Sequence, residues 1–190
     1  MDTPQKKPMT LKSFLREMLE IVLIIVLVVL PFRIFVAEPY IVSGASMSNT
    51  FETGHYLIIN KFWHKFDGLE RGDVIVFRSP TSPSESYIKR VVALPGETIR
   101  ISNNTVSVRG ANEEVFSPLE EPYTSSRTYA NLEQTLTEEE YFVLGDNRSN
   151  SSDSRSWGPL NKSLIKGEPV LRLYPFSQVT PMPGTEVFDY

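Results

Sequence analysis

The sequence predicts a mostly β, antiparallel, barrel-like domain that follows one N-terminal transmembrane helix. An unbroken run of Ile, Val and Leu lies at residues 21–30, near the N-terminus. Several short segments rich in β-branched and aromatic residues follow it, and Gly, Pro, Asn and Asp bound them as they bound antiparallel strands. Long amphipathic helical patterns are lacking after the apolar run. The body is therefore expected to form Greek-key or barrel-like sheets.

The apolar run near the N-terminus predicts a membrane anchor. The apolar stretch extends from Met18 to Ala37, and about 20 apolar residues span a bilayer. A cleaved signal peptide would end in a small-residue A-x-A site, and residues 35–40 contain none. A core helix would be expected to turn a polar face to water, which this run lacks. We therefore expect an uncleaved transmembrane anchor over residues 18–37, kinked or ended near Pro31.

The charges that flank the anchor predict its orientation. Four basic residues precede it, and they are Lys6, Lys7, Lys12 and Arg16. After Arg33, the next Lys or Arg is Lys61. The positive-inside rule then places residues 1–17 in the cytoplasm and exports residues 38–190. The chain is expected to be a single-pass protein of the cell (cytoplasmic) membrane, with the lipid bilayer as a partner and the exported domain on the outer face.

The exported body contains six segments that are typical of short strands. They are residues 56–60, 73–77, 86–93, 98–101, 105–108 and 141–144. Residues 98–101 and 105–108 are expected to pair as a hairpin across residues 102–104. The stretch around this hairpin and beyond, at about residues 97–140, is largely polar and acidic and contains Pro118 and Pro122. It predicts a loop-rich excursion that takes no part in catalysis.

Composition excludes several functional classes. The chain has 190 residues, enough for one domain and an anchor, and a net charge of −4, which gives no reason to expect nucleic-acid binding. Cysteine is absent, which excludes disulfides, a thiol nucleophile and thiolate metal sites. The chain has two histidines and no H-E-x-x-H pattern. No cofactor and no metal are therefore expected.

The common hydrolase signatures are also missing. Neither His55 nor His64 lies in a recognisable hydrolase signature, and no G-x-S-x-G elbow exists. Asp146 and Asp153 each lie two residues before an arginine, which indicates salt bridges with those arginines and not an aspartic dyad.

Four local blocks remain, and together they carry a resemblance. They are residues 43–50 (SGASMSNT), 71–77 (RGDVIVF), 87–97 (YIKRVVALPGE) and 145–158 (GDNRSNSSDSRSWG). In this order, behind an anchor, they resemble the type I signal peptidases, which are bacterial leader peptidases and S26-type Ser/Lys proteases. The resemblance implies a membrane-bound serine endopeptidase that removes N-terminal signal peptides from exported preproteins. It also implies cleavage after small residues in an A-x-A-like pattern.

The resemblance assigns roles to individual residues. It implies Ser46 as nucleophile, Lys89 as general base and Ser151 as the hydroxyl that orients the lysine. It implies structural support around the site from Asp146, Arg148, Asp153 and Arg155. It implies a substrate pocket lined by Val42, Ser43, Met47, Phe51, Tyr87 and Ile88.

The chemistry of a lysine base is consistent with the third block. An ordinary lysine has a pKa of about 10.4 and is protonated at neutral pH. A dry, apolar setting disfavours the ammonium, and catalytic lysines are typically lowered to about 7–8. On a strand, Lys89 shares a face with Tyr87 and Val91, while Arg90 points to the other face.

Three positions depart from the family pattern. Asn49 stands where a proline is usual, which is expected to loosen the turn after the nucleophile. Ala93 stands where a glycine is usual, and it would be strained if the backbone needs positive φ. Gly44 stands where some members carry a hydroxyl. The Ser46 N–H is then one oxyanion donor, while the second is open between Ser43 and Ser48.

Other functions stay open at this point. One is a Ser–Lys protease of narrower range, dedicated to a single pilin or transfer protein. Another is a pseudoprotease that only binds export substrates, which the intact Ser46 and Lys89 disfavour. A self-cleaving repressor is disfavoured by the anchor and by the absence of a helix-turn-helix segment.

Overall fold

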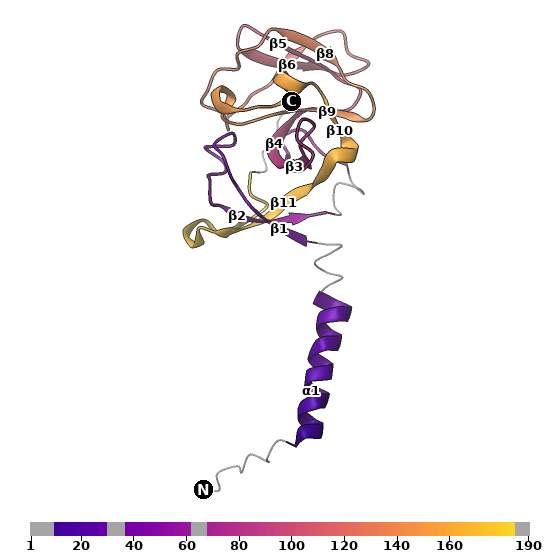
Figure 1. Ribbon diagram of the computed structural model, residues 1–190. Coiled ribbons are helices and arrows are strands. Elements are labelled where there is room, and N and C mark those ends of the chain that lie inside the picture. Colours follow the sequence, from indigo (N-terminus) through magenta and orange to yellow (C-terminus); the bar gives the residue numbers. More distant parts are fainter. Residues whose placement is uncertain (1–9, 30–36, 62–67, 185–190) are drawn as a thin grey trace. The chain divides into compact units, whose positions relative to one another are not determined.

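Figure 1 shows the computed structural model, which describes residues 10–29, 37–61 and 68–184. The chain divides into two compact units, Met1–Ala37 and Glu38–Tyr190. The first unit contains the N-terminal helix, and the second contains the sheets and the four sequence blocks.

The N-terminal helix begins earlier than the expected anchor. Helix α1 (Leu11–Ile24) starts at the N-cap Thr10, whose side chain forms a capping box with Ser13, and it continues as the π-helical segment η1 (Ile25–Val29). None of its residues is buried. Among the described residues, no helix has the length and apolarity needed to cross a bilayer. Pro31 and the end of the expected anchor lie outside the described residues.

The larger sheet of the second unit is an antiparallel half-barrel of eight strands. Its order is β1-β2-β11-β3-β4-β9-β10, and β12 pairs with β11. The strands are β1 (Ala37–Ile41), β2 (Tyr56–Asn60), β3 (Val74–Arg78), β4 (Ser86–Ala93), β9 (Glu140–Leu144), β10 (Leu160–Asn161), β11 (Ile165–Tyr174) and β12 (Thr180–Pro181). The mostly β, antiparallel fold predicted from the sequence is confirmed.

A smaller sheet of four strands lies at the top of the view in Figure 1. Its order is β7-β6-β5-β8, with β5 (Thr98–Ser102), β6 (Thr105–Arg109), β7 (Ser117–Pro118) and β8 (Leu132–Thr135). The predicted hairpin is confirmed, because β5 and β6 pair antiparallel up to Ser102 and Thr105. Asn103 and Asn104 both have positive φ, as a two-residue hairpin turn requires. The segment at residues 97–140 therefore contains this small sheet together with long connections between its strands.

Short helical turns connect the remaining strands. They are η4 (Arg148–Asn150), α2 (Ser154–Trp157), η5 (Lys162–Leu164) and η6 (Phe176–Gln178). Asp153 caps α2, because its carboxylate accepts a hydrogen bond from the Arg155 N–H. The cap holds the fourth sequence block at the end of β9.

Strand β11 joins the two halves of the larger sheet. It pairs with β2 along one part of its length and with β3 along another, and bulges interrupt both registers. Gly167, at the crossing, has φ +153, and a Cβ there would lie 2.0 Å from the Asn60 carbonyl oxygen. A side chain at residue 167 would therefore push β11 away from β2.

We expect Gly167→Ala to destabilise the fold by more than about 2 kcal/mol, because overpacking against backbone cannot relax cheaply. Thermal unfolding of the full chain in detergent measures this. Gly110→Ala is a suitable control, since its added Cβ would meet the movable side chain of Glu113. Equal melting temperatures for the two variants would contradict this account of β11.

Candidate active site

Ser46 lies in the turn that follows β1. Within this turn the N–H groups of Thr50 and Phe51 donate to the Met47 carbonyl oxygen, at 3.0 and 2.8 Å. The side chains of Met47 and Phe51 are 1% and 0% exposed and pack with Leu57 in a hydrophobic cluster. Because these apolar side chains anchor the turn in the core, the turn is held in place beside β4.

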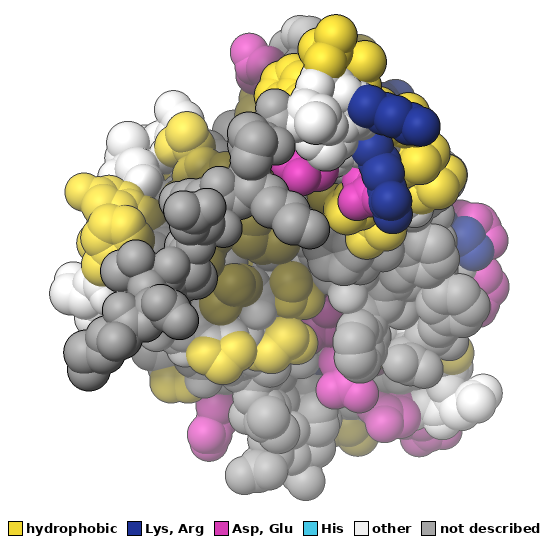
Figure 2. Space-filling model, turned by 90° about the horizontal axis from the view of Figure 1, so that it is seen from below, with side chains coloured by type: hydrophobic (Ala, Val, Ile, Leu, Met, Phe, Trp, Pro, Cys, Tyr) yellow, Lys and Arg dark blue, Asp and Glu magenta, His cyan; other side chains and the backbone are white. Residues whose placement is uncertain are grey.

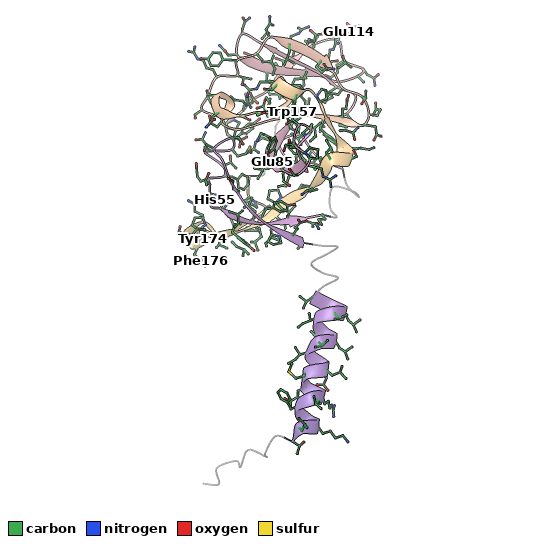
Figure 3. All side chains as sticks on the ribbon, viewed as in Figure 1. His55, Glu85, Glu114, Trp157, Tyr174 and Phe176 are labelled. Atoms are coloured by element: carbon green, nitrogen blue, oxygen red, sulfur yellow. The ribbon has the colours of Figure 1, made fainter. Side chains whose placement is uncertain are left out.

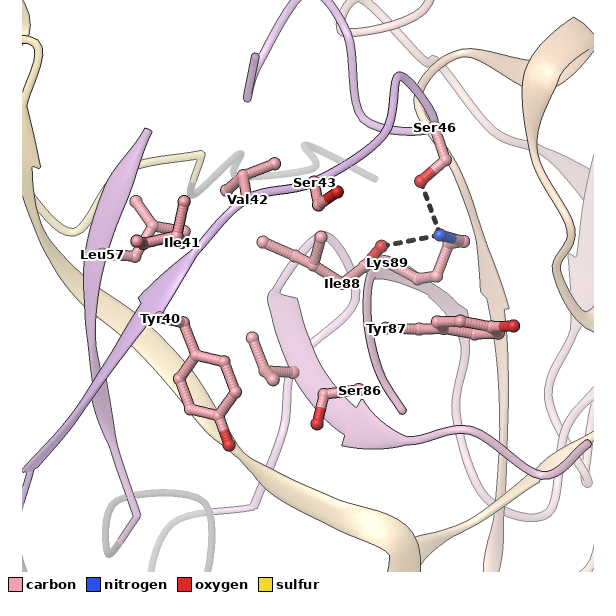
Figure 4. Close-up of a pocket in the computed structure, with 11 residues that line it drawn as sticks. Tyr40, Ile41, Val42, Ser43, Ser46, Leu57, Ser86, Tyr87, Ile88 and Lys89 are labelled. Atoms are coloured by element: carbon pink, nitrogen blue, oxygen red, sulfur yellow. Dashed lines mark hydrogen bonds between the residues drawn. The ribbon is translucent and has the colours of Figure 1, made fainter. Parts of the chain in front are cut away.

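Lys89 reaches Ser46 from β4. Its Nζ lies 2.6 Å from the Ser46 Oγ and 2.8 Å from the Ile88 carbonyl oxygen, and Figure 4 shows both hydrogen bonds. Lys89 is 3% exposed, although it carries an amine. The first and third sequence blocks, which are 43 residues apart at this contact, therefore meet at a hydroxyl–amine pair.

Burial changes the acid–base behaviour of this lysine. Desolvation lowers the pKa of Lys89 to about 8, while the carboxylates of Asp153 and Asp146 act in the opposite direction. The Tyr87 ring centroid lies 5.5 Å from the Nζ atom. A substantial fraction of Lys89 is therefore neutral slightly above neutral pH, so its amine can accept a proton.

The fourth block packs directly against the Ser46 turn. The Asn147 N–H donates to the Ser46 carbonyl oxygen at 3.0 Å, and its side-chain amide donates to the Ala45 carbonyl oxygen at 3.0 Å. A Cβ at Gly145 would lie 2.5 Å from the Ser46 carbonyl oxygen and 2.3 Å from the Ser151 Oγ. Gly145 thus has no room for a side chain, which lets the strand end approach the Ser46 turn closely.

Ser151 lies at this junction, but its hydroxyl does not bond to the lysine. In the described part of the chain its buried Oγ has no hydrogen-bond partner. The Ile88 carbonyl oxygen accepts from Lys89 instead and orients the amine. The lysine-orienting role of Ser151 stays a prediction.

Buried ion pairs support the site, but Asp146 pairs with a different arginine from the one expected. Asp153 pairs with Arg155 at 2.8 Å, as the spacing predicts. Asp146 does not bond to Arg148. It forms a bidentate pair with Arg90, at 2.9 and 2.7 Å, and both side chains are fully buried. Since Arg90 follows Lys89 on the strand, its side chain turns to the opposite face and holds β4 against the fourth block.

Arg148 is held by the segment that was expected to be a loop-rich excursion. Its guanidinium pairs with Glu121 and donates to the Thr128 hydroxyl and to the Gly145 carbonyl oxygen. The ring of Tyr123 lies 4.1 Å from the Arg90 guanidinium carbon. Glu121, Thr128 and Tyr123 therefore help to position the site, and no local sequence motif indicates this.

A cavity of about 100 Å³ lies beside the Ser46–Lys89 pair (Figure 4). It is lined by Tyr40, Ile41, Val42, Ser43, Ser46, Leu57, Val76, Ser86, Tyr87, Ile88 and Lys89. Of the residues predicted to form a substrate pocket, Val42, Ser43, Tyr87 and Ile88 line this cavity, and their role in substrate binding stays a prediction. Met47 and Phe51 do not line it, because both are buried in the core next to Val42. Leu57 on β2 and Val76 on β3, for which no sequence motif predicts a place in a pocket, also line it and share a hydrophobic cluster with Val42.

Two of the three departures from the family pattern, Asn49 and Ala93, fit the local backbone. Asn49 has φ +93, which proline cannot adopt, and its side-chain amide donates to the Ser125 Oγ at 3.2 Å. Ala93 does not have a positive φ and is fully buried, so the expected strain is absent. Ser48 donates its hydroxyl to Glu52 at 3.2 Å, whereas Ser43 lines the cavity. The second oxyanion donor stays a prediction, open between Ser43 and Ser48.

The histidines give no alternative base among the described residues. The Nδ1 atom of His55 accepts a hydrogen bond from the Glu52 N–H at 3.2 Å, which ties the ring into a turn. His64 lies outside the described residues. A serine hydroxyl next to a buried, partly neutral amine is the arrangement of a serine hydrolase that uses lysine as its base.

Comparison with known proteins identifies the family. The family described as signal peptidase, peptidase S26, matches residues 15–174. A probable signal peptidase I-1 from Synechocystis sp. is 34% identical over 174 residues, covering 87% of this chain and 86% of that protein. A signal peptidase I from Bacillus caldolyticus is 37% identical over 164 residues, covering 80% and 88%. A crystal structure of a signal peptidase I from Enterococcus faecalis V583 is 29% identical, covers 53% of this chain and 95% of its own, and has a TM-score of 0.45.

The chain therefore belongs to the type I signal peptidases of the S26 serine peptidase family, which are proteases of protein secretion. The resemblance inferred from the four sequence blocks is confirmed.

We expect Asp146→Ala to destabilise the protein by roughly 3–5 kcal/mol, because it leaves the buried Arg90 guanidinium without its counter-ion. Glu133→Ala is the matched control. It breaks the exposed Arg100–Glu133 pair, which contributes about 0–1 kcal/mol. Denaturant unfolding of both variants in detergent measures the difference, and similar losses for the two would show that the buried pair is not a major support of the fold.

Proposed function

We propose that this chain removes signal peptides from secreted preproteins with Ser46 as nucleophile and Lys89 as general base. The observation that carries the proposal is the 2.6 Å hydrogen bond between the Ser46 hydroxyl and the buried Lys89 amine. Family membership supports the substrate class, since the relatives are named signal peptidases.

The reaction follows from the geometry of the pair. The neutral Lys89 amine accepts the hydroxyl proton as the Ser46 Oγ attacks the scissile carbonyl carbon. The developing oxyanion accepts hydrogen bonds from the Ser46 N–H and the Ser43 hydroxyl. The Lys89 ammonium then donates its proton to the leaving amine of the mature protein. Water attacks the acyl-enzyme, again giving a proton to Lys89, and the Ser46 Oγ leaves with that proton restored.

The lining of the cavity supports binding of apolar side chains. Val42, Leu57 and Ile88 contribute to it, which is consistent with alanine side chains of an A-x-A-like pattern. The stretch of β4 from Ser86 to Lys89 pairs with β3 on one edge, while its pairing with β9 begins at Arg90. The open edge could bind an extended substrate by β-augmentation.

Exposed apolar surface supports a membrane location. The apolar side chains of α1 and η1 are exposed along their length, for example Leu27 at 67% and Val28 at 60%. In the second unit, Tyr174 and Phe176 lie at the tip of the β11–β12 hairpin, as Figure 3 shows. Figure 2 shows exposed hydrophobic side chains at the left, on the side where this hairpin lies in Figure 1. We propose that the N-terminal segment anchors the chain in the membrane and that the hairpin contacts the interface.

Replacing either member of the pair is expected to abolish cleavage. We expect Ser46→Ala, Lys89→Ala and Lys89→Arg to lower kcat/KM on a preprotein with an A-x-A site by about 10⁴-fold or more, because nucleophile and base act as a unit. Arginine keeps the positive charge but cannot act as a base.

Lys162→Ala is the matched control for these variants, since Lys162 forms an exposed pair with Glu139. It should cleave at the wild-type rate. Full activity in any of the three site variants would contradict the mechanism.

The cleavage rate is expected to rise with pH and to reach half of its plateau near pH 8. The sign follows from the lowered pKa of Lys89, because the neutral amine becomes the main form only above about 8. The measurement is kcat/KM from pH 6 to 10, which reports groups of the free enzyme. A profile that is flat across this range would argue against a titrating lysine base.

A further inference from the structure

Lys166 connects the two walls of the cavity at the end away from Ser46. It lies on β11, and its Nζ donates to the Tyr40 hydroxyl at 2.9 Å and to the Ser86 Oγ at 2.8 Å. Tyr40 belongs to β1 and Ser86 begins β4. In Figure 4 both side chains lie at the end of the cavity opposite Ser46. The lysine therefore joins two strands that are not neighbours in the sheet.

Tyr40 and Ser86 line the cavity, whereas Lys166 lies next to it, bonded to both, so the position of these two partners sets which substrate residues come near the Lys166 ammonium. Lys89 and Ser86 are three residues apart on β4, or about 10 Å at roughly 3.3 Å per residue. This step rests on the proposed function, in which the scissile bond lies at Ser46 and the preceding small side chains enter the cavity. An extended substrate then brings its fourth and fifth residues before the bond to the Lys166 end.

At this end of the cavity, the described side chains that bond to one another include two ammonium groups and one carboxylate, so their net charge is positive. The Tyr40 hydroxyl donates to Glu38 at 3.0 Å, and Glu38 also pairs with Lys61 at 2.6 Å. Lys61 thus compensates Glu38, while Lys166 adds a second ammonium. Glu85, which directly precedes β4, is exposed and accepts a hydrogen bond from the Tyr87 hydroxyl at 3.4 Å.

With respect to the described residues, Lys166 also keeps hydrogen-bonding capacity for a substrate. An ammonium has three N–H donors, and two of them serve Tyr40 and Ser86. Lys166 is half-buried, so its charge is less screened by solvent than that of a fully exposed lysine.

We propose that Lys166 determines specificity at the upstream end of the substrate site. Its charge disfavours Lys or Arg at the fourth and fifth positions before the cleaved bond and favours acidic or neutral polar residues there. Through Tyr40 and Ser86 it also holds the two walls of the cavity at a fixed separation.

The test uses three preprotein substrates that differ only in the fourth residue before the bond, which is Asp, Asn or Lys. For wild type we expect kcat/KM to be about tenfold higher for Asp than for Lys, the size of effect that close charge pairs give at binding sites. Lys166→Gln should reduce this ratio to about twofold or less, and Lys166→Arg should retain it.

Two controls separate charge selection from a structural role. Lys162→Gln removes an exposed lysine elsewhere and should keep the wild-type ratio. If Lys166→Gln lowers kcat/KM equally for all three substrates, or leaves the ratio unchanged, Lys166 does not select charge and the inference fails. A loss of the ratio in Lys166→Arg as well would also overturn it.

The binding of the same three peptides to Ser46→Ala, measured by fluorescence anisotropy, tests the inference without cleavage. The Asp peptide should bind more tightly than the Lys peptide, and the added change Lys166→Gln should remove the difference. If wild type cleaves no substrate, the proposed function fails. The binding preference then still decides the role of Lys166, and equal affinities would overturn it.

Discussion

The site depends on keeping the Lys89 amine out of water beside the Ser46 hydroxyl. Lowering the pKa of this lysine from 10.5 to about 8 corresponds to roughly 3 kcal/mol that the fold must supply against the ammonium. Two buried carboxylates, Asp146 and Asp153, oppose the effect. Each of them is paired with an arginine, so the neighbourhood can hold both carboxylates and still contain a partly neutral amine.

Three other parts of the structure help to hold the Lys89 amine beside the Ser46 hydroxyl. Strand β4 presents Lys89 to the cavity and Arg90 to the opposite side, so adjacent cations reach different surroundings. The fourth block reaches the Ser46 turn through Asn147 and through the close approach at Gly145. The smaller sheet and its connections add Glu121, which neutralises Arg148. The buried contacts that stabilise the fold thus also position the proposed catalytic pair.

Much of this site could be predicted from the sequence, because residues close together in the sequence form most of its recognisable patterns. The alternation in Tyr87–Val91 indicated that Lys89 and Arg90 face opposite ways, and the four blocks indicated the family. Strand β11 was missed, since Gly167 and Pro169 are poor strand residues, and they are tolerated here at bulges. The pairing of Asp146 with Arg90 was also missed, because it joins residues 56 positions apart and has no spacing signature.

The protonation state of Lys89 is the central claim, and it can be measured without following cleavage. In protein labelled with ¹³C at lysine Cε, NMR titration of the full chain in detergent should show one signal with a pKa of about 8. That signal should disappear in Lys89→Arg, which assigns it. If the Lys89 signal instead titrates near 10.4, as an ordinary lysine does, the amine is charged at working pH and the account is contradicted.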